Sequence, residues 1–308
     1  MDHRGDRVAP ACFVAGALFA GGNAVGIRLC VRELDPLWSA ALRFGAAALL
    51  LALVVVALRL PWPRGNALVG AALFGLLNFG VTFALTYYAL VDIHAGIGQT
   101  TLALVPLVTL LLSVLQGQER LRPTALGGTL CAAAGVAVIS RAPLQGSVPL
   151  LSLLALLGSV LCFAQSAVLV ERLPKVHPVT MNAVGMVAGA VALFAGSLLA
   201  GDRWVLPERA TTWWALAYLV VAGSVLTFVC YLLVIQHWGA SRAAYAFVVV
   251  PVFAITASAW LDDEPLTITL LLGTPLILAG VYLGALRRPR RSTRAPVRPP
   301  GGQPPRSG

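Results

Sequence analysis

Two apolar stretches decide the fold of this chain, "LVPLVTLLLSVLQGQERL" at 104–121 and "VVPVFAITASAWLDDEPL" at 249–266. Each stretch carries a proline within the apolar run and a glutamate thirteen residues further on; the pairs are Pro106 with Glu119 and Pro251 with Glu264. The two pairs are separated by a constant offset of 145 residues. Because proline and glutamate are less common here than the small and aliphatic residues that dominate the chain, their agreement in register indicates an internal repeat.

The composition of the chain is that of a membrane protein. Of its 308 residues, 58% are hydrophobic and 11% are charged, whereas about a quarter are charged in ordinary soluble domains. Apolar segments of about twenty residues are long enough to cross a bilayer as helices, and such segments make up most of the sequence. We therefore predict an all-α integral membrane protein.

Ten transmembrane helices are predicted from the apolar segments and the polar breaks between them. The expected spans are 9–27, 38–58, 67–89, 95–115, 124–140, 149–170, 179–200, 213–236, 240–261 and 267–286. All seven tryptophans lie at or near the ends of these spans. Tryptophan is enriched at the membrane–water interface, so its positions support the predicted boundaries.

The repeat divides the ten spans into two five-helix units. The expected organisation is a first repeat at 9–140, a connecting loop at 141–148 and a second repeat at 149–286, with terminal segments at 1–8 and 287–308. Because five is an odd number, the second unit enters the membrane from the opposite side. Inverted-topology repeats are a recurrent architecture of secondary transporters, whose solute site lies between the halves.

The distribution of basic residues predicts the orientation. With the N-terminus inside, the inner segments hold sixteen of the 22 lysines and arginines, the outer loops hold five, and Arg43 lies within a span. Both termini are thus expected to be cytoplasmic at the plasma membrane. The tail at 287–308 has seven arginines and six prolines, so we expect it to be disordered and to bind anionic lipid. Dispersed basic residues that set topology do not indicate nucleic-acid binding.

The repeated prolines and glutamates have expected roles within each half. Pro106 and Pro251 fall near the middle of their predicted spans, where a proline removes a helical hydrogen bond and kinks the helix. Glu119 and Glu264 lie at helix ends, where capping or fixing the turn is a more common role than contact with a solute. No aspartate or glutamate falls in the middle of a predicted span. We therefore expect transport that is facilitative, or coupled through peripheral groups such as His94 or His237.

Polar side chains inside the spans are the candidates for the walls of a solute cavity, because their burial in lipid is costly. Amide side chains both donate and accept hydrogen bonds, which suits polar or amphipathic solutes. For each amide, however, a hydrogen bond between helices is an equal alternative, and Arg43 could extend to the interface or form a structural pair. The candidates are Asn23, Arg43, Asn78, Gln99, Thr100, Gln165, Asn182 and Tyr245.

The paired patterns also carry a family resemblance. "ALRF" at 41–44, the two quoted stretches and the glycines that follow each of them resemble the EamA-type family of the drug/metabolite transporter superfamily. The resemblance covers residues 10–286. It implies a ten-helix inverted-repeat fold, a central cavity surrounded by the first four helices of each half, and transport of small metabolites, often as export. Together with the inverted repeats, this predicts a secondary transporter that works by alternating access on amino acids or related polar or amphipathic compounds.

Two other function classes are alternatives to transport. A membrane-embedded enzyme acting on a lipid phosphate could use "LDDEP" at 261–265 as a magnesium site, but the repeat copy at 116–120 keeps only its glutamate. A non-transporting membrane sensor is the other alternative. Because catalytic and metal-binding motifs are lacking, we expect no enzyme activity, no metal and no cofactor. Three GxxxG pairs permit close helix packing and leave a homodimer open.

Overall fold

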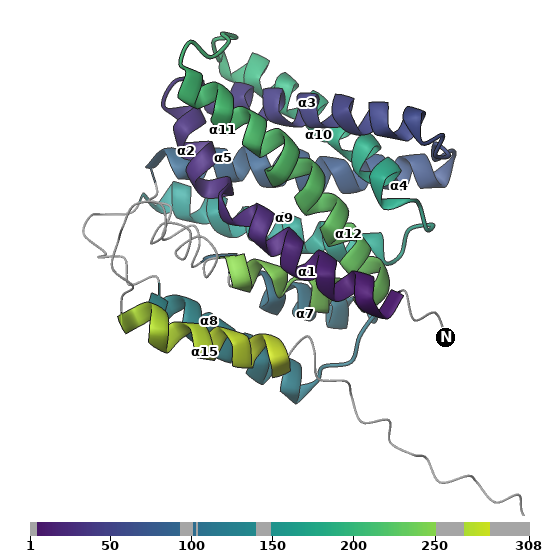
Figure 1. Cartoon of the computed structure of the whole chain (residues 1–308), viewed down its shortest axis with the longest axis vertical. Helices are drawn as coiled ribbons and strands as arrows, with labels where there is room; N and C mark the ends of the chain where they lie inside the picture. The colour runs from purple at the N-terminus through teal and green to yellow at the C-terminus, as the bar shows by residue number, and fades with distance from the viewer. Residues whose placement is uncertain (1–4, 93–100, 103, 140–148, 251–267, 284–308) are drawn as a thin grey trace, which may run out of the picture.

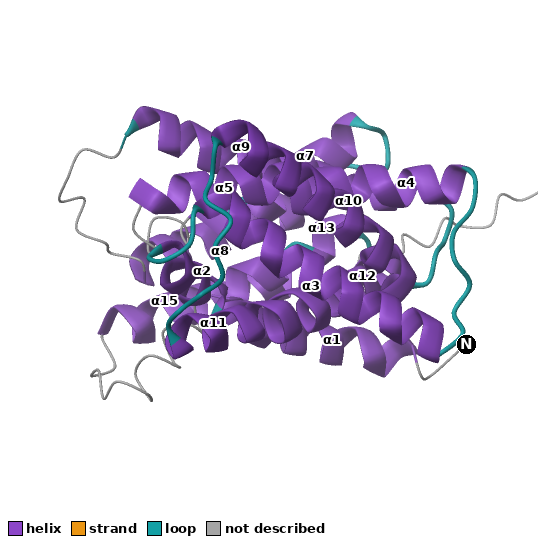
Figure 2. Ribbon diagram, turned by 90° about the horizontal axis from the view of Figure 1, so that it is seen from above, coloured by secondary structure: helices purple, strands orange, loops and turns teal. Residues whose placement is uncertain are grey.

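The structure is a computed structural model that describes residues 5–92, 101–102, 104–139, 149–250 and 268–283. Every regular element among these residues is helical. Figures 1 and 2 show the helices lying side by side across the molecule, so that most of the connections gather at its two ends. The predicted kink at Pro251, the acid Glu264 and the sequence "LDDEP" all fall outside the described residues.

Within the described ranges, six helices are long and apolar enough to cross a membrane, and they confirm six of the predicted spans. Three of the six are interrupted within their length. In chain order they are α1 (Gly5–Gly21) with α2 (Asn23–Val31), α3 (Pro36–Ala57), α4 (Asn66–Gly75) with η1 (Leu76–Val81) and α5 (Thr82–Asp92), α9 (Leu150–Val170), α10 (Pro178–Ala200), and α11 (Ala210–Val220) with η2 (Val221–Leu226) and α12 (Thr227–Trp238).

Shorter helices occupy the described parts of the other predicted spans. They are α7 (Val105–Leu115), α8 (Pro123–Ile139), α13 (Ala240–Ala243), which opens the apolar helix Ala240–Val250, and α15 (Ile268–Val281). The total of ten transmembrane helices stays a prediction, because parts of these spans lie outside the described residues.

The helix contacts follow a two-fold pattern that relates the two halves of the chain. The first span of each half packs against the third span of the other: α1 and α2 on α12 and α11, and α9 on α5 and α4. The second spans pack on each other, α3 on α10, and so do the last, α8 on α15. Figure 1 shows the pair α8–α15 at one edge of the molecule, beside the other helices.

Two pairs of glycines match at the offset of 145, Gly128 with Gly273 and Gly135 with Gly280, and all four lie in the contact between α8 and α15. A Cβ atom added to Gly135 would lie 2.8 Å from the carbonyl oxygen of Gly273, and one added to Gly280 would lie 2.5 Å from that of Gly128. The matched glycines therefore form the reciprocal contact between the two halves, where small residues let helix backbones approach closely.

A second close contact joins the third span to α10. A Cβ atom on Gly75 would lie 2.0 Å from the carbonyl oxygen of Gly185, and one on Gly189 would lie 2.4 Å from the Cβ of Phe79. The GxxxG pair Gly185/Gly189 is thus used for packing inside the chain, rather than left on the surface for a partner.

The sequence predicts that Pro106 kinks a continuous helix near its middle. The structure instead places Pro106 at the start of a helix. The structure starts α7 at Val105, with Leu104 as its N-cap, so Pro106 lies in the first turn. The missing N–H of a proline costs nothing there, because the first N–H groups of a helix have no partner within the helix. Pro106 therefore marks a helix start.

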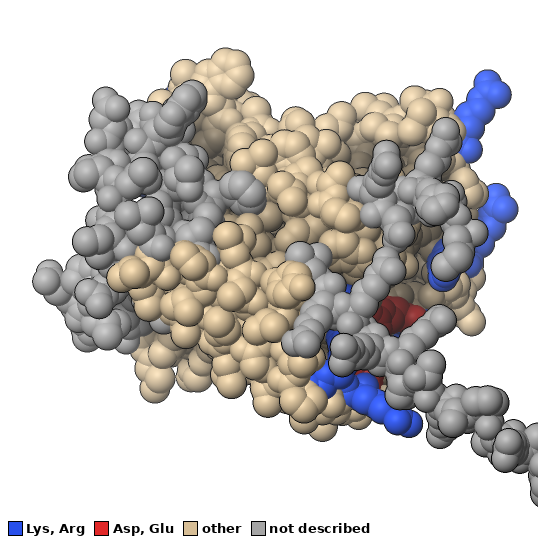
Figure 3. All heavy atoms as spheres, turned by 60° about the horizontal axis from the view of Figure 1, so that its bottom comes forward, with Lys and Arg blue, Asp and Glu red and all other residues tan. Residues whose placement is uncertain are grey.

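The described surface is largely apolar. Long aliphatic and aromatic side chains stand out from several helices; Leu115, Leu199 and Trp214, for example, are 81%, 89% and 77% exposed. In Figure 3 most of the described surface on the face shown is uncharged, and the lysine, arginine, aspartate and glutamate side chains gather toward the end where the chain begins. Such a surface suits a protein whose sides contact lipid.

Candidate functional site

A central cavity of about 110 Å³ lies between the two halves. This volume is several times what a single water molecule needs. Aromatic rings make up much of its wall, from Phe83, Phe163, Phe228 and Phe247. Its polar lining comes from both halves: Asn23, Thr82, Thr86, Ser159 and Thr227. The cavity therefore fits a small solute with an apolar body and a limited number of polar groups.

The first span is interrupted beside this cavity. Helix α1 ends at Gly21 and α2 begins at Asn23. The phenol oxygen of Tyr218 accepts a hydrogen bond from the Gly22 N–H (3.2 Å) and donates one to the carbonyl of Phe19 (2.8 Å). The interruption places the Asn23 side chain at the start of a new helical segment, on the wall of the cavity.

The third span of each half contains a π-helical turn at the same repeat position. The segments η1 (Leu76–Val81) and η2 (Val221–Leu226) are separated by 145 residues. The threonine after each turn bonds back to a carbonyl five residues earlier: Thr82 to Leu77 and Thr227 to Ala222, each at 2.8 Å. Single π-helical turns within α-helices often occur at functional sites, and both threonines line the cavity.

Arg43 is fully buried against η2. Its Nε donates to the Ser224 hydroxyl (2.8 Å), and its Nη2 donates to the Gly223 carbonyl (2.8 Å) and to the Asn23 Oδ1 (3.3 Å). Its guanidinium carbon lies 4.9 Å from the ring centre of Phe44 and 5.0 Å from that of Phe83. Arg43 is therefore held inside the protein by η2 and does not extend to the interface.

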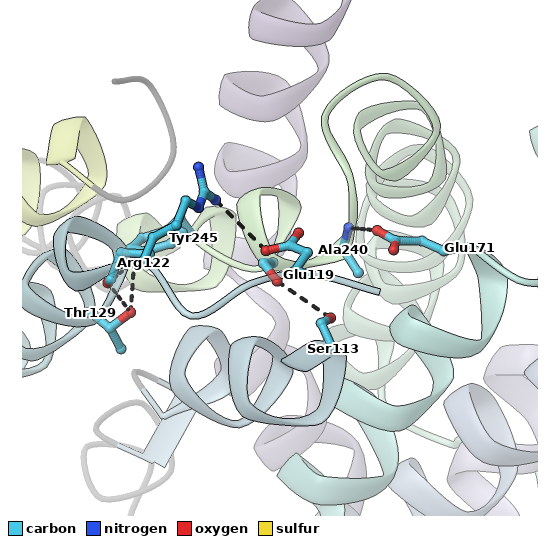
Figure 4. A network of polar contacts seen from close by, with 9 residues as sticks. Ser113, Glu119, Arg122, Thr129, Glu171, Ala240 and Tyr245 are labelled. Atoms are coloured by element: carbon cyan, nitrogen blue, oxygen red, sulfur yellow. Dashed lines mark hydrogen bonds and ion pairs between the residues drawn. The ribbon is translucent and has the colours of Figure 1, made fainter. Parts of the chain in front are cut away.

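A network of polar contacts closes the end of the molecule where α9 stops and α13 starts (Figure 4). The Glu171 carboxylate accepts a hydrogen bond from the Ala240 N–H, at the first residue of α13. Glu119 forms an ion pair with Arg122 (3.7 Å), and its backbone N–H donates to the Ser113 carbonyl (3.3 Å). These contacts fit the turn-fixing role expected of Glu119.

At the opposite end, carboxylates connect the two halves of the chain. Glu33 accepts hydrogen bonds from the backbone N–H groups of Glu208 and Arg209 and from the Thr212 hydroxyl, at the start of α11. Asp35 accepts one from the Arg203 N–H (2.7 Å). Each end of the helix bundle thus has polar contacts between distant parts of the chain, which we call the two end closures.

Comparisons with known proteins agree with this architecture. The sequence profile of the EamA-like transporter family matches residues 9–141 and 150–285, which is most of the chain. The chain belongs to the EamA-like transporter family. The resemblance seen in the sequence is thereby confirmed, and the protein is a multi-pass membrane transporter of the drug/metabolite transporter type.

A solved crystal structure is similar to this EamA-like chain over nearly its whole length. It is 19% identical and superposes with a TM-score of 0.74 over 90% of this chain and 96% of its own. At this level of identity the similarity shows the fold alone. No curated protein matches the chain.

The predicted site residues of this EamA-like protein fall into three groups. Asn23 lines the cavity. Arg43 does not line it but donates a hydrogen bond to the Asn23 side chain. The other described candidates bond between helices or lie buried elsewhere: Asn78 accepts from Ser166 (2.8 Å), Gln165 accepts from Gln116 (2.7 Å), Tyr245 donates to Ala125 (2.9 Å), and Asn182 is fully buried outside the cavity wall. Gln99 and Thr100 lie outside the described residues.

Several cavity residues were missed from the sequence. Thr82, Phe83, Thr227 and Phe228 all line the cavity. They form the dipeptide Thr-Phe in each half at the offset of 145, so extending the repeat alignment backwards would have found them. Nothing in the sequence pointed to Ser224, because its role follows from the π-helical turn in which it lies.

The two end carboxylates of this transporter should give opposite pH dependences of stability. Burial, together with the charge of Glu119, raises the pKa of Glu171 above its ordinary value of 4.5, although the Ala240 N–H lowers it in part. The stability that Glu171 contributes is therefore full below pH 4.5 and is lost as the pH rises through the raised pKa. We expect Glu171→Gln, which keeps an acceptor for the Ala240 N–H, to melt at a higher temperature than the wild type at neutral pH.

Glu33 supplies the matched control with the opposite sign. The Thr212 hydroxyl and the N–H groups of Glu208 and Arg209 lower its pKa below 4.5, so its contribution is present at neutral pH and is lost as the pH falls. Glu33→Gln should melt below the wild type at neutral pH, with the difference shrinking in acid. The melting temperatures of the purified wild type and of both variants, measured across pH, test the two predicted directions. The same change with pH in both variants, relative to the wild type, would contradict this assignment.

Proposed function

We propose that this chain is a secondary exporter of small metabolites with an apolar body and a few polar groups, such as amino acids and related compounds. It works by alternating access through the central cavity, between two inverted five-helix repeats that total ten transmembrane helices. The repeats are 9–140 and 149–286, and both termini face the cytoplasm at the plasma membrane. The basic tail contacts anionic lipid.

One observation carries this proposal. The cavity is lined by matching residues of both halves, a threonine and a phenylalanine that directly follow a π-helical turn at the same repeat position in each half. Each half thus presents a similar wall to the same space, which is the arrangement that rocking of one repeat against the other requires.

The closures at the two ends support the mechanism. Glu171 with Ala240 joins α9 to α13 at one end, and Glu33 joins the segment after α2 to α11 at the other. In each, a carboxylate accepts hydrogen bonds from groups at a helix N-terminus: one bond to Glu171, within the second repeat, and three to Glu33, between the two repeats. Contacts of this kind can break and re-form at small cost as the cavity opens to one side and then to the other.

Comparing metabolites inside and outside cells tests the function. In cells that overproduce the protein, a transported solute is expected to become enriched outside, and in cells that lack it the same solute should accumulate inside. Reversed signs would identify uptake and would contradict export. An unchanged metabolite profile in varied growth media would contradict transport of a metabolite by this chain.

A further inference from the structure

The buried guanidinium of Arg43 has no resident counter-ion among the described residues. The arginine is 0% exposed, and the two described ion pairs, Glu119 with Arg122 and Asp35 with Arg203, do not involve it. Neutral oxygens and two aromatic faces are its described partners. A buried charge is costly unless it is paired, and ionisable residues inside membrane helices usually serve function.

The Nη1 side of the guanidinium lies among hydroxyl groups and not beside a described carboxylate. Buried Nη1 makes no hydrogen bond of standard geometry, and neither do the buried hydroxyls of Ser39 and Tyr87, although the Tyr87 hydroxyl lies close enough to interact with both Arg43 and Ser39. Ser39 lies one helical turn before Arg43 on α3, and Tyr87 interacts electrostatically with Arg43 from α5. Such unsatisfied buried donors are rare in folded proteins and ask for an explanation. Together, these groups offer several donors to one additional acceptor.

The solute cavity lies next to this charge. Asn23, whose Oδ1 accepts from Nη2 of Arg43, lines the cavity, and so does Phe83, whose ring lies against the guanidinium. A small movement of the Asn23 side chain would expose Nη2 to an acceptor in the cavity. The charge belongs to one half only, because alanine stands at position 188, which is 145 residues after Arg43.

We propose that Arg43 binds the carboxylate of the transported solute, and that Asn23 occupies the carboxylate's place when the cavity is empty. Arginine suits this role because its planar fork of N–H donors matches the two oxygens of a carboxylate. The aromatic wall takes the apolar body of the solute. The described cavity lining contains no aspartate or glutamate, so the favoured class is a small carboxylate with an apolar body and a net negative charge.

Two probes of similar size and shape, one anionic and one neutral, test this assignment, which rests on the proposed function and deepens it. The full-length protein in nanodiscs of uncharged phosphatidylcholine is melted with phenylacetate or with phenylacetamide. A ligand that binds the folded state raises the melting temperature in proportion to its affinity. The apparent affinity for phenylacetate is expected to exceed that for phenylacetamide by about tenfold or more. Equal responses to the two probes, or an equal response to sodium chloride, would overturn the proposal.

Two variants at one position separate binding from folding. Asn23→Asp places a resident carboxylate beside Arg43, so it should melt no lower than the wild type and should lose the response to phenylacetate. Asn23→Ala removes the competing acceptor without adding a charge and should keep the response. A destabilised Asn23→Asp protein, or one that still responds to phenylacetate, would overturn the proposal.

The transport function can survive the failure of this inference. If cells export a neutral compound while the purified protein does not distinguish phenylacetate from phenylacetamide, the proposed function stands and the carboxylate assignment fails. If cells export no compound and the purified protein also fails to distinguish the two probes, both the proposed function and the carboxylate assignment fail.

Discussion

Gly75→Ala is expected to cost at least about 3 kcal/mol of stability, because the new methyl group would overpack a contact between two backbones. The added Cβ would lie 2.0 Å from the carbonyl oxygen of Gly185 and 2.2 Å from its Cα. The atoms that the new Cβ would meet are all backbone atoms, so no side chain can rotate to make room and α4 and α10 would have to separate. The expected result is a large fall in the melting temperature of the purified protein, or the loss of folded protein altogether.

Gly45→Ala is the matched control for this change. Gly45 also lies within a membrane helix, α3, but a Cβ atom there would meet nothing within 4 Å. Alanine is favoured over glycine inside a helix by about 1 kcal/mol, so this variant should melt at or above the temperature of the wild type. If both variants melted like the wild type, the close backbone approach at Gly75 would be wrong.

Blocking the cavity after folding is expected to reduce transport by about tenfold or more, because the aromatic and hydroxyl-lined space leaves little spare room. Ser159 lines the cavity, and its hydroxyl bonds only to the Leu156 carbonyl of its own helix (2.7 Å) among the described contacts. In a chain whose native cysteines are replaced, Ser159→Cys would be modified with a benzyl thiosulfonate. Export of the solute found by the metabolite comparison is then measured before and after modification.

Leu161→Cys controls for modification of the same helix. Leu161 lies two residues further along α9 and is 51% exposed on the outer surface. The same reagent there should leave export close to its starting rate, because a lipid-facing benzyl group does not enter the solute path. Equal loss of export in both variants would mean that modification disturbs α9 as a whole, and would remove the support for this cavity as the path.

The sequence predicted the arrangement of the helices better than it predicted the site. Long apolar segments have few alternatives to crossing the membrane, and the structure places helices close to the predicted spans, such as Pro178–Ala200 for 179–200. The matched glycines, Gly135 and Gly280 among them, pack in the contact between α8 and α15. Repetition in register was a useful signal, because glycines that match between the halves form a contact between them.

The site was only partly predictable, because a buried amide can serve a solute or a neighbouring helix equally well. Asn23 and Asn78 look alike in the sequence, yet the first lines the cavity and the second accepts a hydrogen bond from Ser166. Their difference depends on helix rotation and on the π-helical turns, for which the sequence offered no signal. The same applies to Arg43, whose partners on η2 are a backbone carbonyl and a serine hydroxyl.

Access to Ser159→Cys from each side of the membrane tests the central claim most directly. The measurement is the rate of labelling by a membrane-impermeant, charged thiosulfonate in right-side-out and in inside-out vesicles, with Leu161→Cys as the background. Alternating access through the cavity predicts labelling from both sides, each faster than at Leu161→Cys. Labelling of Ser159→Cys from one side only, or from neither, would contradict the claim that the cavity opens in turn to the two sides.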